Sequence, residues 1–287
     1  MKENFLIKKY FKIISTLLII SLFLTTLPVQ IFADETDTAD KTPTVSADNK
    51  VDTEANIIGE VTEKRQSNVK TFIKDDMTFE AVVYPASVHY KDNGEWKDID
   101  NTLTEQKDED SNDVLQNKAN DVNISIAKKI KADKLVKIKT DKYELSWSID
   151  NVDDNSSASV VNKTARQLDS LSGNDRRKTL TNINSAVEFK NVYPDIDLQY
   201  QIISKDVKEY ITLKKAVPNT EFTFNLQTKN LVAELQEDKT IKLFDDKDPS
   251  KEVYRINAPF MFDREGRGKH CNRCFAGQNE SWLCFKI

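Results

Sequence analysis

Short runs of alternating apolar and polar residues constrain the fold of this chain more than any other feature. They begin at Val69 and continue to Phe262, for example VKTFIK (69–74), YELSWSID (143–150) and DLQYQII (197–203). Successive residues of a β-strand point to opposite faces, so a period of two is typical of strands with one buried face. No long amphipathic helical pattern competes with these runs. The sequence therefore predicts an all-β, β-sandwich-like protein, built as one large domain or as two packed β subdomains.

Two hairpins are predicted near the start of this region. ASVHY (86–90) and EWKDI (95–99) flank Asn93-Gly94, a pair that supplies the positive φ angles of a tight turn. VKTFIK and TFEAVVY (78–84) form the other hairpin, around Asp75, Asp76 and Met77. The polar stretch at 105–121 that follows is expected to be a loop with a short helix.

The first 33 residues have the features of an export signal. Four lysines (Lys2, Lys8, Lys9 and Lys12) precede an apolar run at 13–27, and small Ala33 stands before an acidic stretch. This order predicts a signal peptide over 1–33 that is cleaved after Ala33. An uncleaved anchor is the alternative, but the run is shorter than the ~20 residues of a membrane span. We therefore expect a secreted protein, extracellular or cell-wall associated, that meets the membrane only through its signal peptide.

The remaining chain divides by composition. Residues 34–56 contain no aromatic side chain and are rich in Asp, Thr, Ala and Lys, which predicts a disordered linker. The strand-like runs form a first β-rich unit at 57–150 and a second at 182–265. A polar loop or boundary at 151–181 separates them, and an atypical tail covers 266–287.

The charge of the chain argues against nucleic acid as a partner. The leader contains four lysines and one glutamate, so its removal changes the net charge from −5 to −8. No run of Lys or Arg is free of interleaved acids, whereas a surface that binds phosphates is normally basic. We expect no nucleic-acid partner.

A spaced motif near the first hairpins resembles a known family. The chain reads YPASVHYKDNGEWKDIDNTL from Tyr84, with Tyr90, Gly94, Trp96 and Asp100 at a specific spacing. It resembles the N-terminal module of bacterial wall-associated and RHS (YD-repeat) surface proteins. The blocks VEFKNVYPDIDLQYQIISKDVKEYITLKK (187–215) and INAPFMFDREG (256–266) extend the resemblance over 57–266.

The resemblance implies a β scaffold at the start of a longer surface protein. In this family the module is often followed by DNRLRE-type domains, then by YD repeats and sometimes by a C-terminal toxin. It carries over no catalytic residue. Two turns depart from the family, because glycine is expected where this chain has Asp76-Met77, and also within ISKDVKE (203–209).

One pair of acids could form a site in the second block. Asp195 and Asp197 stand two apart, so on a strand they would share a face. Paired carboxylates serve glycoside hydrolysis or cation binding. The preferred alternative is that Asp195 caps the turn after Pro194 and that Asp197 starts a strand.

A second acidic group resembles the start of a calcium loop. Asp108, Asp110 and Asn112 stand at alternate positions, as the first ligands of such a loop do. The loop also needs a glycine and a glutamate, where this chain has Asp113 and Ala119. A solvated acidic loop is the preferred interpretation.

A histidine and several aromatic residues complete the candidates in the body of the chain. His89 is the only histidine before the tail, so it alone could serve a catalytic triad, but no serine or cysteine motif accompanies it. Tyr84, Tyr90, Trp96 and Trp147 could form a sugar-stacking platform. Aromatic residues in β proteins are more often core or cross-strand pairs, and we expect that role here.

The tail contains all three cysteines, Cys271, Cys274 and Cys284. A zinc site needs four ligands, and His270 is a doubtful fourth because it adjoins Cys271. A redox Cys-x-x-Cys normally opens a helix in a βαβ unit, and that setting is missing here. We expect no metal or cofactor. We predict instead that residues after Gly266 are not native to the module, that they arise from a frameshift or premature stop, and that they are poorly ordered and dispensable for stability.

These observations predict a non-enzymatic N-terminal β scaffold of an exported RHS-type cell-surface protein, present here as a truncated fragment. No catalytic, cofactor-binding or metal-ligating residue is expected. Partners would be the cell envelope or other surface modules. The alternative is an extracellular carbohydrate-binding or carbohydrate-active domain, which requires convergent polar groups in a concave pocket.

Overall fold

The computed structural model describes residues 54–153, 155–161, 171, 173–216, 221–263, 265, 268–270 and 281–286. The predicted signal peptide and most of the predicted linker lie outside these residues. Residues 53–287 belong to one compact unit. Within the described ranges, no helix is both long and apolar enough to cross a membrane.

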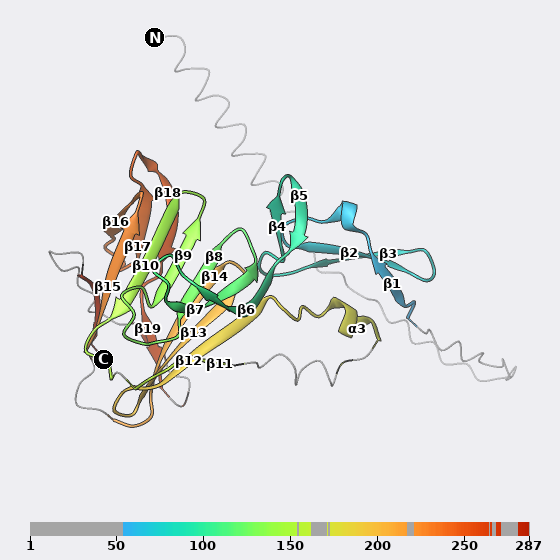
Figure 1. Ribbon diagram of the computed structural model, residues 1–287. Coiled ribbons are helices and arrows are strands. Elements are labelled where there is room, and N and C mark those ends of the chain that lie inside the picture. Colours follow the sequence, from blue (N-terminus) through green and yellow to red (C-terminus); the bar gives the residue numbers. More distant parts are fainter. Residues whose placement is uncertain are drawn as a thin grey trace, which may run out of the picture. The chain divides into compact units, whose positions relative to one another are not determined.

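A seven-stranded antiparallel sheet is the largest element of the fold (Figure 1). Its strands, in order across the sheet, are β21 (Ser281–Lys286), β15 (Glu221–Lys229), β10 (Tyr143–Ile149), β9 (Val136–Thr140), β8 (Asn123–Ala127), β7 (Asp113–Ala119) and β6 (Asp100–Lys107). The predicted all-β, sandwich-like fold is confirmed.

The chain also forms five smaller sheets within the described residues. A four-stranded sheet contains β11 (Ser159–Val160), β12 (Asn184–Tyr193), β13 (Ile196–Ile203) and β14 (Asp206–Leu213). Two three-stranded sheets contain β1 (Ile57–Glu60), β2 (Val69–Lys74) and β3 (Phe79–Val83), and β16 (Leu231–Leu235), β17 (Ile241–Asp245) and β18 (Asp248–Ile256). Two hairpins contain β4 (His89–Asp92) with β5 (Glu95–Asp98), and β19 (Phe260–Phe262) with β20 (Gly268–His270). The described helices are a 3-10 turn, η1 (Thr62–Lys64), and α3 (Gly173–Lys178).

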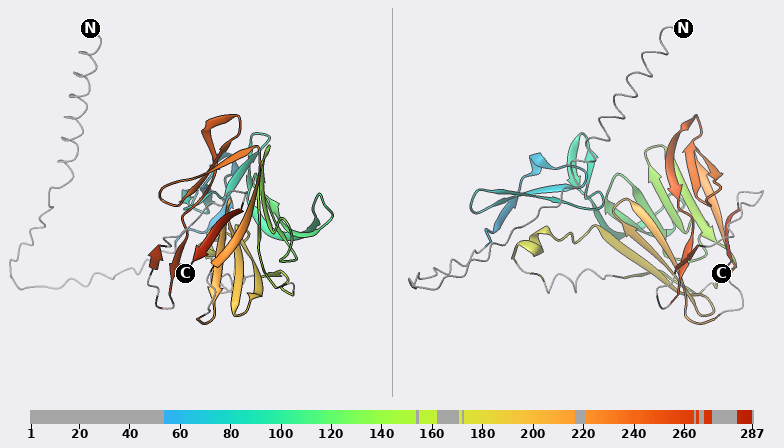
Figure 2. Two further views of the ribbon diagram at one scale, coloured as in Figure 1. Left: turned by 90° about the vertical axis from the view of Figure 1, so that its left-hand side faces the viewer. Right: turned by 180° about the vertical axis from the view of Figure 1, so that it is seen from behind.

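One face of the seven-stranded sheet forms the core. Buried side chains of β8 and β9, among them Ile124, Ile126 and Val136, pack against Phe189 of β12 and Leu198 of β13. Figure 2 shows the green and the yellow strands as these two layers. A second cluster joins β10 and β15 to the sheet β16–β18 through Leu145, Leu226, Leu231, Ile241 and Leu243. Each of these buried side chains stabilises the fold by roughly 1.5–3 kcal/mol.

The two predicted β-rich units are interleaved. Strand β15 comes from the second stretch but pairs with β10 of the first, from Glu144 opposite Lys229 to Ile149 opposite Phe224. Figure 1 shows the orange β15 beside the green β10. Strand pairing therefore joins the two stretches within the compact unit of residues 53–287.

Two differences from the sequence analysis concern strands. The prediction of a loop with a short helix within 105–121 is wrong, because this stretch completes β6 and forms β7. The turn between these two strands has Ser111 at φ 64°. In the tail, Ser281–Lys286 forms β21 along β15, which differs from the expectation of a poorly ordered segment. The pairing of β21 with β15 was not apparent from the sequence, because the two strands lie about 60 residues apart and such pairing leaves no local pattern.

The predicted hairpin at Asn93-Gly94 is confirmed. Both residues have positive φ, 51° and 88°, between β4 and β5. The hairpin of β2 and β3 is present too, with Met77 at φ 66°.

Candidate functional site

The second face of the seven-stranded sheet is polar where β7, β8 and β9 lie side by side. Gln116 of β7 is opposite Ser125 of β8, and Ser125 is opposite Lys137 of β9. In the next row, Asn123 of β8 is opposite Lys139 of β9. Alternate residues of a strand share a face, so these side chains project together, away from the Ile124 and Ile126 core.

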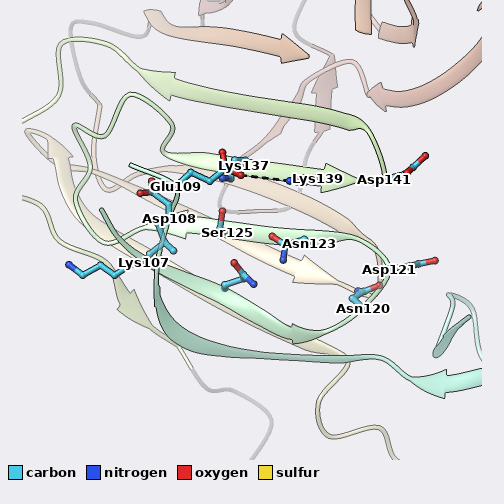
Figure 3. A pocket seen from close by; sticks show the side chains of 12 residues that line it. Lys107, Asp108, Glu109, Asn120, Asp121, Asn123, Ser125, Lys137, Lys139 and Asp141 are labelled. Carbon is cyan, nitrogen blue, oxygen red and sulfur yellow. Dashed lines mark ion pairs between the residues drawn. The ribbon is translucent and has the colours of Figure 1, made fainter. Parts of the chain in front are cut away.

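A hollow of about 380 Å³ lies over these two rows. At one end it is closed by Lys107, Asp108 and Glu109, where β6 turns into β7, and at the other by Asn120, Asp121 and Asp141 (Figure 3). Glu109 reaches back across the sheet, with its Oε1 3.7 Å from Lys139 Nζ. Figure 3 shows Asn123 and Ser125 between these two groups.

The charged groups at the edge of the hollow are largely paired within the protein. Lys107 pairs with Asp113 at 2.8 Å, and Asp121 pairs with Lys205 at 2.6 Å. Burial raises the pKa of Asp108, but hydrogen bonds from Asn112 and the charge of Lys137 outweigh it and hold that pKa below its usual range. Protein contacts therefore already satisfy most of the charge at the rim.

The part of the floor on β7 and β8 is different, because it is neutral and has free hydrogen-bonding groups, whereas Lys137 and Lys139 of β9 lie at its side. Among the described residues, the side chains of Gln116, Asn123 and Ser125 have no hydrogen-bond partner. Ser125 is the most enclosed of the three, 4% exposed. This floor was not apparent from the sequence. The alternation of VNISIAK (122–128) places Asn123 and Ser125 on one face, but the neighbouring Gln116 and Lys137 depend on strand register.

The carboxylate pair Asp195 and Asp197 does not form a site. Asp195 lies in the turn with φ 63° and pairs with Lys215 at 2.7 Å. Asp197 lies in β13, where it accepts a hydrogen bond from the Asn191 N–H and pairs with Lys214. Burial raises the pKa of Asp197, but these contacts outweigh it and lower that pKa. The preferred interpretation, a turn residue followed by a strand residue, agrees with the structure.

The acidic group at 108–112 serves its own turn. Asp108 Oδ1 accepts hydrogen bonds from the backbone N–H groups of Asp110 and Asn112, at 3.0 and 2.7 Å. Its second oxygen accepts from the Asn112 side chain at 3.1 Å. The carboxylate is therefore used as a turn acceptor, as is typical of Asx turns. Within the described ranges, no group of three His, Cys, Asp or Glu residues could hold a metal ion.

His89 is completely buried in the first part of the unit. Its Nδ1 lies 2.6 Å from the carbonyl oxygen of Gln66, to which it donates. The other nitrogen, Nε2, is 3.5 Å from Asp98 and 3.7 Å from Glu60 and has no hydrogen-bond partner among the described residues. Burial lowers the pKa of His89, so the ring is neutral at pH 7.

An ion-pair network surrounds His89. Arg65 forms a two-pronged pair with Glu60 at 2.7 and 3.1 Å and reaches Asp98 at 2.8 Å; Lys70 contacts the same two carboxylates. These residues come from β1, β2, β5 and the segment after η1. The network therefore fixes the β4–β5 hairpin to the first sheet, and His89 fills its centre out of reach of a substrate.

The four aromatic candidates are not brought together. Trp147 packs in the core, where its Nε1 is 3.2 Å from Tyr200 Oη. Trp96 is partly buried in β5, with Lys91 Nζ 5.0 Å from its ring centre. Tyr84 donates to the Lys178 carbonyl at 2.8 Å, and Tyr90 lies on the other face of the hairpin from Trp96. No stacking platform forms from these four residues.

The tail candidates lie mainly outside the described residues. Cys271 and Cys274 are not described, whereas His270 ends β20 and Cys284 lies in β21 opposite Thr223. The prediction that the tail is not native to the module stays a prediction.

Comparisons with known proteins place the chain beside wall-associated bacterial proteins. It is 27% identical over 271 residues to the "tRNA3(Ser)-specific nuclease WapA" of Bacillus spizizenii, which covers 88% of this chain and 11% of that protein. It is 25% identical over 276 residues to the "tRNA nuclease WapA" of Bacillus subtilis, covering 89% and 11%. It is also 25% identical over 207 residues to a "Wall-associated protein" of Geobacillus stearothermophilus, covering 71% of this chain and 75% of that protein. The chain matches no family model and no solved structure.

These relatives support a location in the cell wall or outside the cell, as the sequence predicts. The prediction that this protein is not an enzyme is wrong, because relatives similar to most of the chain are named as tRNA nucleases. That prediction rested on residues that span about a tenth of the length of those nucleases.

Proposed function

We propose that this chain is the wall-associated β module of an exported bacterial surface protein of the RHS type. The observation that carries the proposal is the similarity to the Geobacillus wall-associated protein, which extends over 71% of this chain and 75% of that relative. The basic and apolar leader at 1–33 supports export, and the open polar face of the main sheet supplies a surface for contact with the wall. We further propose that the module is accompanied in its family by DNRLRE-type domains and YD repeats.

The nuclease relatives extend the proposal to the protein that carries such a module. We propose that this protein cleaves tRNA, as the names of the Bacillus relatives say of them. The protein expressed from the complete gene should then shorten purified tRNA on a denaturing gel. A complete gene product that leaves tRNA intact would remove this part of the proposal.

Fractionation of a Gram-positive host that expresses the chain tests wall association. We expect the protein in the wall fraction or the medium, with a mature N-terminus at or near Asp34 by mass spectrometry. A form that lacks residues 1–33 should stay in the cytosol and serves as the control. Full-length protein found only in the cytosol would contradict the proposal.

A further inference from the structure

We propose that the hollow over β7, β8 and β9 binds the neutral glycan strands of the wall, through the hydroxyl and acetamido groups of N-acetylated sugars. This inference rests on the proposed wall association and names the ligand class and the site. It starts from the floor of the hollow, where Gln116, Asn123 and Ser125 have no hydrogen-bond partner among the described residues.

The chemistry of the floor matches a ligand with many neutral donors and acceptors. Each amide side chain offers two N–H donors and a carbonyl acceptor, and a serine hydroxyl both donates and accepts. Sugar hydroxyl and acetamido groups have the same dual character. The row from Gln116 through Ser125 to Lys137 crosses two gaps between strands of roughly 4.8 Å each. That width lets successive sugar rings contact the floor.

The charge around the hollow disfavours an anionic polymer such as a teichoic acid. Three lysines line it, Lys107, Lys137 and Lys139, against four acids, Asp108, Glu109, Asp121 and Asp141. Phosphate chains are held by an excess of positive charge, and their binding weakens steeply with salt. The mixed rim has no such excess, so the neutral glycan is the ligand that its chemistry favours.

The hollow is expected to act through repeated weak contacts. Among the described residues that line it, none is aromatic, so stacking on sugar rings does not contribute. A single site of this kind binds weakly, whereas an insoluble polymer presents many copies of the ligand close together. Sedimentation with purified wall material is therefore a more sensitive measurement than titration with a short oligosaccharide.

The test compares wall binding of the chain and of two double variants. The first, Gln116→Ala with Asn123→Ala, removes hydrogen-bonding groups from the floor. The control, Gln199→Ala with Gln201→Ala, removes a similar pair from β13, where the two side chains bond each other at 3.0 Å on the sheet's outer face. Equal thermal midpoints of the three proteins establish that all are folded.

The probe is peptidoglycan from which teichoic acids have been removed. We expect the floor variant to bind about tenfold less than the unmodified chain, the effect of losing a few neutral hydrogen bonds. The control variant should bind as the unmodified chain does. Binding should change less than about twofold between 50 and 500 mM salt, because no phosphates are neutralised. An excess of a soluble N-acetylglucosamine hexamer should compete.

Each other outcome has a distinct meaning. If the floor variant binds as well as the control, the glycan site is wrong and wall association still stands. If binding requires teichoic acid and disappears at high salt, the ligand is the anionic polymer and the inference is overturned. If the unmodified chain binds neither stripped nor intact walls, the proposed function itself fails.

Discussion

At the scale of single residues, two turns without glycine test how the chain tolerates left-handed backbone. Met77 has φ 66° and is 68% exposed, whereas Ser204 has φ 57° and is buried. Holding a non-glycine residue in the left-handed conformation costs roughly 1–2 kcal/mol of folding free energy, which a substitution by glycine would recover. The greater freedom of glycine in the unfolded chain opposes this gain by about 0.5–1 kcal/mol. Met77→Gly should therefore leave the free energy of unfolding unchanged or raise it by up to about 1 kcal/mol.

Ser204→Gly should have the opposite effect. The Ser204 hydroxyl donates to the Ser87 carbonyl at 2.6 Å, and glycine would leave that acceptor without its bond. A loss of about 1 kcal/mol is expected. Urea denaturation of both variants gives the comparison, and a stabilised Ser204→Gly would show that the hydroxyl contributes less than the backbone strain.

Asn101 is the most connected polar side chain of the spaced motif, and it is 0% exposed. Its Nδ2 donates to the carbonyls of Ile183 and Ser204, both at 2.7 Å, and its Oδ1 accepts from Asn117 and Asn120, both at 3.1 Å. Asn101→Ala leaves several buried groups unsatisfied, so we expect a loss of about 3 kcal/mol or more. Thr102→Ala, at the exposed neighbour, should change stability by less than about 0.5 kcal/mol. Denaturant titration measures both, and similar values would disprove this role.

The motif could be located from the sequence, but the role of Asn101 within it could not. The spacing drew attention to Tyr84, Tyr90, Gly94, Trp96 and Asp100, and the Asn93-Gly94 turn followed directly from local chemistry. The partners of Asn101 lie 82 and 103 residues further along the chain. Long-range contacts of this kind leave no periodic pattern. The floor of the hollow was missed for the same reason, because Gln116 and Ser125 meet only through strand register.

At the scale of elements, β13 and β14 bring an acid into contact with the core. Glu209 of β14 is opposite Tyr200 of β13, next to Trp147 of β10. Burial raises the pKa of Glu209 to about 7, while hydrogen bonds from Tyr200 and Trp147 act in the other direction. The ordinary pKa of a glutamate is about 4.3, so the folded state holds the proton more tightly than the unfolded state.

Stability should therefore fall as the pH rises through about 7. We expect the free energy of unfolding to fall by about 1–3 kcal/mol between pH 5 and 8.5, because Glu209 loses its proton over this range. The substitution Glu209→Gln should remove this fall. The difference between the two proteins at each pH separates this effect from His89, whose pKa is lowered and which titrates at more acidic pH. Parallel stability curves for the two proteins would show that Glu209 does not titrate in this range.

At the scale of the whole molecule, the interleaved strands predict one cooperative unit. The alternation indicated most strands, including EFTFNL at 221–226, but not β7 or β21. It gave no indication that residues 221–226 insert beside β10. The β10 edge is completed by β15, and Ile124, Ile126 and Val136 are covered by Phe189 and Leu198 from the later half of the chain. A fragment of residues 54–161 would expose this face and a free sheet edge to solvent.

We therefore expect the 54–161 fragment to be unfolded or aggregated, and residues 54–287 to unfold in one transition. The shared core means that neither half buries enough apolar surface alone to offset its conformational entropy. Proton NMR of the fragment should lack dispersed amide and methyl signals, and co-expression with residues 171–287 should restore them if the halves complement each other. A fragment with a dispersed spectrum and its own cooperative transition would establish 57–150 as an independent subdomain. The β10–β15 pairing would then be an interface between two domains.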